Sequence, residues 1–297
     1  MIIMKNKAID KASRVRLVFT VLFSRRLCKH GFNLFGTILY YFFIIQFQTA
    51  WRLKKRTVIK VDHPLDADIP FCPEDAKTYL FFIPLWMKSL AFFRAAGGKA
   101  VDTQAIEFMN GLARLYKEAG LIYNKCQSTT NRPKADGRLL FLVIHFFDPH
   151  LHCVPSLHVG VVLYNYFMMR KLLPELCRKG IISKEQSEIS IAWAKQEALA
   201  IIDTILTIKQ HSVNCVAAGL FFLNALYPDD YSRKECLTVV DDLLENRKEQ
   251  IPCLKEIREH IKKLFKEFCA SYDKDTVSAK DYKAVMLDFL KNYQFKN

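Results

Sequence analysis

The sequence predicts an all-α protein, a polytopic membrane helical bundle of about six spans followed by a soluble helical tail. Hydrophobic residues make up 51% of the 297 residues, 25% are charged, and the mean hydropathy is +0.03. This intermediate hydropathy indicates that apolar and charged regions alternate along the chain. Several apolar stretches reach about twenty residues without a charge, which is the length that a helix needs to cross a bilayer core.

The overall charge narrows the class of partner. The chain carries 44 Lys and Arg against 30 Asp and Glu, a net charge of +14, so we expect an anionic partner such as a lipid surface or a phosphorylated substrate. Nucleic acid is not expected, because the basic residues are dispersed among apolar stretches and no recognisable binding module is present. The nine cysteines are widely spaced without a CxxC pair, which argues against a disulfide framework and a structural zinc site.

The first region, residues 1–30, is predicted to be a basic interfacial segment. Its eight Lys and Arg residues surround a short apolar run, LVFTVLF. Two arginines follow this run and there is no small-residue cleavage site, so a signal peptide is not expected. A short apolar run with basic flanks is typical of a segment that lies at a membrane surface.

The second region, residues 31–228, is predicted to be the membrane domain. Residues 32–51 lack any charge and end on an aromatic residue, as expected of a transmembrane helix, with a buried core helix as the alternative. Residues 78–96 are apolar but carry two charges, so they form a weaker span. Residues 104–124 alternate apolar and charged positions at helical spacing, which predicts a surface or interfacial helix.

The later apolar stretches and the tail complete the predicted architecture. Residues 149–169 and 210–228 contain no Asp, Glu, Lys or Arg, whereas residues 190–208 contain three. Each charge at a span centre costs about 2.5–3.5 kcal/mol, so residues 190–208 insert only if their polar groups face protein. Residues 229–297 carry charges of both signs and apolar residues at helical spacing, which predicts a soluble helical tail.

The first of three candidate segments, KCQSTTNRP, places Lys125 seven residues before Arg132, and Pro133 prevents a helix from continuing. Two cations at this interval can converge on one phosphate, the guanidinium as a forked donor and the ammonium as a point charge. Alone, such a pair is more typical of two surface cations in a basic protein.

The second candidate segment, CVPSLHVG, opens an apolar helix with Pro155, Ser156 and His158. Free backbone N–H groups at a helix start bind anions, and the Ser156 hydroxyl adds a donor. An imidazole titrates near neutral pH, so His158 can protonate a leaving oxygen. On its own, this histidine would be an ordinary residue of a helix start.

The third candidate segment, TIKQHSVNC, places His211 at the start of the last apolar helix, with Lys209 two residues earlier. A histidine at the mouth of a membrane helix can attack phosphorus if an acceptor holds its other ring nitrogen. That acceptor is expected one helical turn further on, where the chain has Cys215.

We expect the two histidines at the same face of the membrane. The helix after His158 runs to a basic turn within residues 170–184, and the next helix returns before His211. The positive-inside rule places this turn in the cytosol, which puts the active-site face on the extracytoplasmic side and the tail in the cytoplasm. The expected localisation is therefore that of a multi-pass integral membrane protein.

In this order, the segments resemble the motifs of the PAP2 superfamily, the type 2 phosphatidic acid phosphatases. Lys125, Arg132 and Pro133 match the first motif in full. The second segment, PSLH, has Leu157 in place of the more common glycine and is similar to the inositol-phosphorylceramide-synthase-like branch. The KQH that ends at His211 is similar to the same branch.

The third motif departs from the family pattern. Thr204, Ile205 and Cys215 stand where the family has serine, arginine and aspartate, and His211 alone matches. The resemblance covers residues 125–219 and does not extend to the tail.

The resemblance implies a phosphatase or phosphotransferase that acts on a lipid phosphate, such as phosphatidic acid or an isoprenyl phosphate, without a metal or cofactor. His211 would be the nucleophile that forms a phosphohistidine, and His158 the general acid and base. The phosphate oxygens would be held by Lys125, Arg132, Ser156 and, in place of the absent arginine, Lys209.

Two alternatives remain open. Because Cys215 replaces the aspartate, the chain is alternatively a catalytically weakened lipid-phosphate-binding member; in serine-protease triads, neutralising the orienting aspartate lowers turnover about ten-thousandfold. A zinc site is also conceivable near Asp148 and Cys153, although the candidate ligands include no helical i, i+4 pair and cross two prolines. The histidines of this cluster are His145, His150, His152 and His158.

Overall fold

The computed structural model describes residues 9, 11–134, 138–274 and 281–294, and in these the chain is helical apart from two short strands, which confirms the all-α expectation. The N-terminal elements are α2 (Arg14–Phe23), α3 (Cys28–Thr37), the π-helical η1 (Ile38–Ile44), α4 (Ile45–Ala50) and strand β1 (Thr57–Lys60). The central elements are η2 (Pro64–Asp66), η3 (Pro73–Asp75), α5 (Ala76–Leu80), α6 (Phe82–Gly97), η4 (Gly98–Val101), α7 (Asp102–Lys125), strand β2 (Cys126–Thr129) and α8 (Leu139–Phe147). The C-terminal elements are α9 (Leu157–Arg178), α10 (Lys184–Thr207), α11 (Val213–Leu226), α12 (Arg233–Asp242), η5 (Glu245–Gln250), α13 (Leu254–Lys274) and α14 (Tyr282–Asn292).

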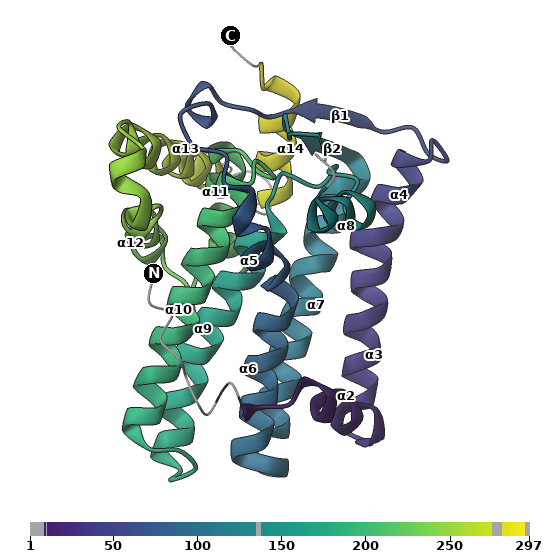
Figure 1. The fold of residues 1–297 in the computed structure, drawn as a ribbon. Helices are drawn as coiled ribbons and strands as arrows, with labels where there is room; N and C mark the ends of the chain where they lie inside the picture. The colour runs from purple at the N-terminus through teal and green to yellow at the C-terminus, as the bar shows by residue number, and fades with distance from the viewer. Residues whose placement is uncertain (1–8, 10, 135–137, 275–280, 295–297) are drawn as a thin grey trace.

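Long helices that run side by side form the body of the molecule (Figure 1). Helices α9 and α10 form an antiparallel hairpin, α6 and α7 form a second, and α3, η1 and α4 make one continuous rod. Helix α9 packs against α6, α7, α10 and α11, and most of its residues are buried. Its apolar sequence is therefore explained by burial in protein on several sides.

Serine caps determine where the histidine-bearing helices begin. The Ser156 side chain accepts a hydrogen bond from the Val159 N–H at 3.4 Å, and the Ser212 side chain accepts one from the Asn214 N–H at 3.2 Å. Serine is favoured at this position because its oxygen satisfies a backbone N–H that has no partner within the helix. The caps therefore fix the first turn of α9, which carries His158, and the start of α11, which follows His211.

The outer faces of the long helices do not support six spans. Glu107 and Arg114 are exposed along the middle of α7, and Lys195, midway along α10, pairs with Asp242 at 2.7 Å. A charge at the bilayer centre costs about 2.5–3.5 kcal/mol, so these faces suit water or protein. Within the described residues, one helical stretch, Pro73–Lys125, is long and apolar enough to cross a membrane by length and composition. The finer prediction of about six spans is not confirmed.

Large apolar side chains are exposed on other helices of the molecule. Residues 32–51, expected as the first span, form most of the α3–η1–α4 rod, which turns an apolar face outward. Helices α2 and α8 add further exposed phenylalanines and leucines. These exposed side chains include Phe19, Phe23, Phe32, Phe35, Leu39, Ile44, Leu139, Phe146 and Phe147.

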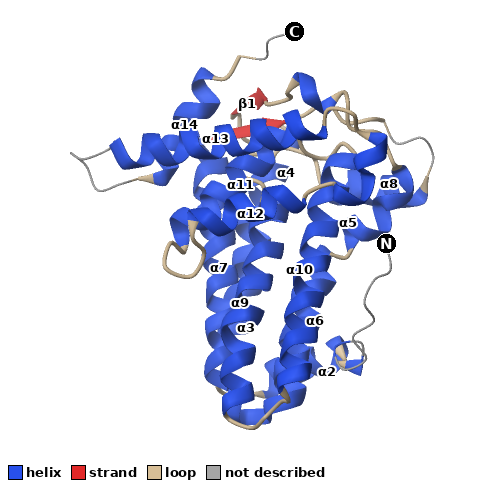
Figure 2. Ribbon diagram, turned by 90° about the vertical axis from the view of Figure 1, so that its left-hand side faces the viewer, coloured by secondary structure: helices blue, strands red, loops and turns tan. Residues whose placement is uncertain are grey.

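The tail lies at the same end of the bundle as the histidines, which corrects the expectation that a membrane separates them. Helix α11 has 14 residues, about 21 Å at 1.5 Å per residue, and is too short for a hydrocarbon core of about 30 Å. The chain then turns back, and α13 and α14 reach the end that carries the strands (Figure 2). His260 Nε2 lies 2.8 Å from Asn214 Oδ1, and the Asn214 amide donates to Tyr293 Oη at 2.9 Å.

The two strands fix the loop that precedes α9. Strands β1 and β2 pair in parallel, with Thr57 opposite Cys126. Ser128 of β2 also forms a parallel bridge with His152, and its hydroxyl accepts a hydrogen bond from the Val154 N–H at 2.7 Å. The segment between α8 and α9 is therefore attached to the sheet just before the first turn of α9.

Candidate active site

The structure brings His158 and His211 into direct contact. His158 Nδ1 lies 3.2 Å from His211 Nε2, although 53 residues separate them. His158 lies in the first turn of α9, and His211 lies in the short connection between α10 and α11. Both side chains are buried. The two histidines meet because the α9–α10 hairpin returns the chain to its starting end. The sequence predicts this return from the basic turn between the two helices.

A small enclosed cavity lies at this contact. It is lined by both histidines, with Phe42 and Leu157 as its apolar walls. About 10 Å³ is open to a water-sized sphere, which is about the space that one water molecule needs. A phosphate group is larger, so the two imidazoles must separate before a phosphate enters. The remaining lining residues are Asp148, His150, His152 and Cys153.

Aromatic rings hold the His158 imidazole. The ring centroids of Tyr79 and Phe82 each lie 4.6 Å from that of His158. These two residues belong to α5 and α6, and α6 packs against α9, so the two rings set the direction in which His158 points. Ring contacts constrain the orientation of an imidazole without a hydrogen bond. His158 can therefore rotate against these two rings without breaking a polar bond to them.

His211 has one ring nitrogen without an acceptor. Its Nδ1 is buried and has no hydrogen-bond partner among the residues that the structure describes. The thiols of Cys215 and Cys153 lie beside each other, and the Cys215 thiol also interacts with the His211 ring. Cys215 thus occupies the place where the sequence predicts an acceptor, but a thiol is a weak one.

Arg132 is a cation at the edge of the site. Its guanidinium donates to the Asp148 carbonyl oxygen at 3.0 Å and to Gln210 Oε1 at 3.2 Å. Asp148 lines the cavity and Gln210 directly precedes His211. Burial lowers the pKa of Arg132 from its ordinary value, yet a guanidinium stays protonated in proteins. A positive charge therefore lies at the rim of the histidine cavity.

His150 is a cavity residue that the motif reasoning missed. Its Nε2 lies 2.8 Å from Thr130 Oγ1, and its ring centroid is 6.4 Å from that of His211. Burial, reinforced by the Arg132 charge, lowers the pKa of His150 well below its ordinary value. Its φ of 64° lies in the left-handed region, which non-glycine residues seldom adopt outside sites where the fold requires it. The dense run of histidines was the sequence signal for it.

Asp148 links several parts of the site. Its Oδ1 accepts a hydrogen bond from the His150 N–H at 2.8 Å, and its Oδ2 accepts one from the Tyr79 hydroxyl at 3.1 Å. Asp148 therefore connects the turn that carries His150 with the aromatic wall behind His158. From the sequence, this carboxylate is expected only as a possible metal ligand.

Three of the predicted phosphate ligands lie elsewhere. Lys125 is exposed at the last residue of α7 and does not line the cavity. The Lys209 ammonium donates to the carbonyl oxygens of Asp66 and Ile69, and burial lowers its pKa. Ser156 is buried as the cap of α9 and is not among the lining residues. Of the four expected ligands, Arg132 is the one that reaches the rim.

The structure gives no support for the zinc alternative. Within the described part of the chain, no group of three or more His, Cys, Asp or Glu side chains is arranged to hold a metal ion. His152 is engaged instead by Gln127, whose Nε2 lies 3.2 Å from the imidazole Nε2, and by the Tyr123 ring, stacked at 4.0 Å between centroids.

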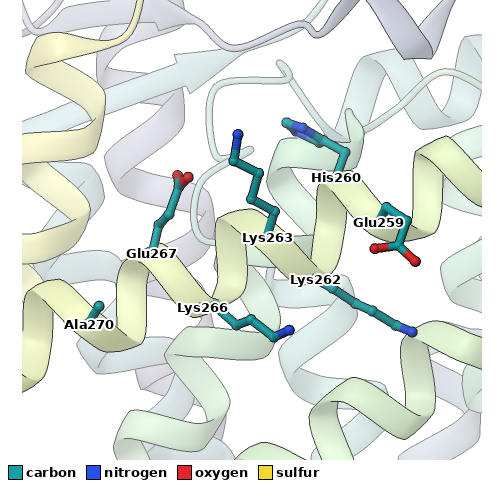
Figure 3. A pocket seen from close by; sticks show the side chains of 7 residues that line it. All are labelled: Glu259, His260, Lys262, Lys263, Lys266, Glu267 and Ala270. Carbon is teal, nitrogen blue, oxygen red and sulfur yellow. The ribbon is translucent and has the colours of Figure 1, made fainter.

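A separate surface hollow of about 680 Å³ lies on the outer face of α13. Figure 3 shows His260 and Lys263 extending to one side of this helix and Lys262 and Lys266 to the other. All of its lining residues belong to α13, so no second element closes over it. The chemistry of the histidine cavity has no counterpart there.

Comparison with protein families, with curated proteins and with solved structures found no match to this chain.

Proposed function

We propose that the protein is a membrane phosphatase or phosphotransferase that cleaves a lipid phosphate through a phosphohistidine on His211. The observation that carries this proposal is the 3.2 Å contact between His158 Nδ1 and His211 Nε2 in a buried cavity. Two facing imidazoles supply one nucleophile and one proton carrier, and these are the two groups that such a transfer requires. Arg132 at the rim adds the charge that favours a phosphate.

In the first step, His211 Nε2 attacks the phosphorus atom of the substrate. The P–N bond forms, the bond between phosphorus and the lipid oxygen breaks, and His158 gives its proton to that oxygen. His158 donates this proton as an imidazolium, because a neutral ring would have to become an imidazolate. The pair therefore takes up one proton from water when the anionic phosphate binds, and His158 is left neutral after the transfer. Arg132 stabilises the charge on the phosphoryl oxygens.

In the second step, water or an acceptor alcohol attacks phosphorus from the opposite direction. His158 now accepts a proton from the attacking oxygen, the P–N bond breaks, and His211 returns to its neutral form. With water the product is inorganic phosphate, and with an alcohol it is a new phosphate ester. The same residues serve both outcomes.

The cavity must open for either step. Reacting atoms need to be about 3–3.5 Å apart, and a proton donor must lie within hydrogen-bond reach of the leaving oxygen. Phosphorus and its oxygens do not fit between two nitrogens that are themselves 3.2 Å apart. The described arrangement therefore corresponds to the closed form of the site, and substrate binding has to separate the rings.

The lipid character of the substrate is supported by the surface of the molecule. Large apolar side chains are exposed along α2, α3, η1 and α8, and contiguous exposed apolar surface is typical of a membrane or ligand interaction. We propose that this side faces the bilayer. We also propose that the chain crosses the membrane several times, with the site on the extracytoplasmic face. The tail then lies on that face too.

A second candidate function is lipid-phosphate binding without turnover. It is favoured by the Nδ1 of His211, which has no hydrogen-bond partner among the described residues. The Cys215 thiol beside this ring is a weaker acceptor than a carboxylate. The ring is therefore a poorer nucleophile, because the positive charge that develops on it is less well stabilised.

The deciding experiment measures phosphate release by the purified protein in detergent, from short-chain phosphatidic acid and from an isoprenyl phosphate. The variant is His211→Ala, and the matched control is His30→Ala, which removes an imidazole that bonds to Asn110 at 2.9 Å on another pair of helices. We expect His211→Ala to lose at least about a thousandfold in rate and His30→Ala to keep the wild-type rate.

An acid-labile, alkali-stable phosphoprotein that is absent from His211→Ala would identify the intermediate. If the wild type and His211→Ala release phosphate equally from every ester, the enzyme proposal is refuted. Retention of phosphatidic acid by both proteins without release would then establish the binding function.

A further inference from the structure

An apolar groove of about 540 Å³ runs between α2, the α3–η1 rod and α6. Helices α3 and α6 both pack against α7 (Figure 1), and α7 contributes Met109 to the lining of the groove. The lining consists almost entirely of hydrocarbon, aromatic and sulfur side chains. This volume is within the range of small-molecule sites in proteins, about 300–1,000 Å³.

The groove reaches the wall of the histidine cavity. Phe43 lines the groove and Phe42 lines the cavity, and their rings are in edge contact with centroids 5.0 Å apart. On α6, Ile83 lines the groove while the neighbouring Phe82 packs on His158. The apolar groove is therefore separated from the two imidazoles by Phe42 and Phe43 on η1 and by Phe82 and Ile83 on α6.

The dimensions fit one lipid chain. Cys28 and Phe43 mark the extent of the groove along the α3–η1 rod, and 15 residues at 1.5 Å span about 22 Å. Half of a bilayer core of about 30 Å is about 15 Å, so a chain that spans one leaflet fits in full. Each buried methylene contributes about 0.8 kcal/mol of transfer free energy, so a lining without charges favours hydrocarbon over any polar occupant.

We propose that this groove binds one hydrocarbon chain of the lipid phosphate and that the chain positions the phosphate at the His158–His211 pair. The proposal rests on the proposed function, since it assigns the tail of the same substrate. It predicts that activity depends on chain length, because a short chain reaches the phosphate site without filling the groove.

The test narrows the groove from its exposed side. Val18 of α2 lines the groove and is 42% exposed, so Val18→Trp adds bulk at the groove without enlarging a buried residue. The matched control is Val15→Trp on the same helix, which is 67% exposed and does not line the groove. Phosphate release is measured for a long-chain phosphatidic acid and for a short-chain one.

We expect Val18→Trp to raise KM for the long-chain substrate by about fifteenfold, if the indole displaces two methylenes that are each worth about fourfold in affinity. We expect Val18→Trp to leave KM for the short-chain substrate at the wild-type level. We expect Val15→Trp to leave KM for both substrates at the wild-type level. Equal effects of Val18→Trp on both substrates would overturn the proposal. So would a change of oligomeric mass in Val18→Trp alone, which would identify a second copy of the chain as the occupant.

A binding measurement separates this proposal from the enzyme function. Trp86 lines the groove and is 9% exposed, so a brominated acyl chain in the groove should quench its fluorescence. The expected result is quenching by brominated phosphatidic acid in the wild type that is lost in Trp86→Phe and absent with unbrominated lipid. If the wild type shows no quenching that depends on Trp86, the groove proposal fails, whether or not the protein is an active enzyme. Quenching in a protein that hydrolyses nothing supports the groove and refutes only the enzyme function.

Discussion

Replacing Cys215 by aspartate should accelerate the reaction. His211 Nδ1 is buried without a hydrogen-bond partner among the described residues, and the Cys215 thiol lies beside the ring. A carboxylate at this position would accept a hydrogen bond from the Nδ1–H and stabilise the imidazolium that forms during the transfer. Aspartate and cysteine are both short side chains, so the change introduces charge with little change of bulk.

The expected gain follows from the strength of the new bond. A hydrogen bond to a charged group contributes about 1.5–3 kcal/mol, and each 1.36 kcal/mol of barrier is a factor of ten. If the bond acts fully in the transition state, kcat rises roughly 10- to 150-fold. The buried carboxylate costs stability in the resting protein, because burial penalises its charge. Burial raises the pKa of the neighbouring Cys153 thiol, so that side chain stays uncharged.

The assay is phosphate release at saturating substrate, with a thermal unfolding curve for each variant. Cys215→Asn is the matched control, because it has the shape of aspartate without the charge, and we expect it to stay within a few-fold of the wild type. A Cys215→Asp protein that unfolds cooperatively, keeps substrate binding and shows no gain in kcat would refute the assignment of His211 as the nucleophile held through Nδ1.

Further predictions concern the other residues at the cavity. His158→Gln should lower the rate for alkyl phosphates about 100-fold or more but spare a nitrophenyl phosphate ester, whose leaving group needs no proton; equal losses on both would contradict the acid role. Arg132→Lys should raise KM for the phosphate substrate about tenfold, because an ammonium lacks the forked geometry, whereas an unchanged KM would remove Arg132 from the site. Burial lowers the pKa of His152 to about 3, whereas its pKa in the unfolded state is about 6.5. As the pH falls, the unfolded state therefore binds the proton first. The folded protein loses stability as the pH falls below about 6.5. Between pH 6.5 and pH 5 this loss amounts to about 2 kcal/mol, and His152→Gln should flatten the pH dependence of thermal unfolding by that amount, with an unchanged slope counting against the burial argument.

The sequence was sufficient to predict the meeting of His158 and His211. Hydropathy located two helices joined by a basic turn, and a hairpin of two such helices necessarily returns the chain to its starting end. Local capping added the position of each histidine, because Ser156 and Ser212 mark helix starts in the sequence as they do in the structure. These features depend on short-range patterns, which a single sequence retains.

The position of the tail could not be predicted in the same way. The apolar stretch 210–228 has the composition of a span, but its helical part is the 14-residue α11, which is buried by protein except at Ala225. Hydropathy does not distinguish burial in lipid from burial in protein. The polar face of α7 shows the same limit. The charges of Glu107 and Arg114 argue against a lipid-facing helix only once the structure shows that they lie on its exposed face.

Motif spacing also placed one cation wrongly in space. Lys125 and Arg132 fit the expected interval, but Lys125 ends α7 and the chain then enters strand β2. The six residues between them are therefore extended and carry Arg132 away to the cavity rim. His150 was present in the sequence next to the second motif, but spacing alone could not show that the turn after Asp148 directs it toward His211.

The two imidazoles are held so differently that we expect His158 rather than His211 to move when the site opens. The helix that follows His211 is fixed at its start by polar contacts, since Asp66 Oδ1 accepts from the Val213 N–H at 2.9 Å and Asn214 is bonded to the tail. His158 is held by the rings of Tyr79 and Phe82, which have no comparable polar anchor to it. Phe82 is adjacent to a residue of the apolar groove, so a hydrocarbon chain that displaces the start of α6 also releases His158. Opening of the phosphate site then follows from filling of the groove, and a short-chain substrate should show a lower kcat as well as a weaker affinity.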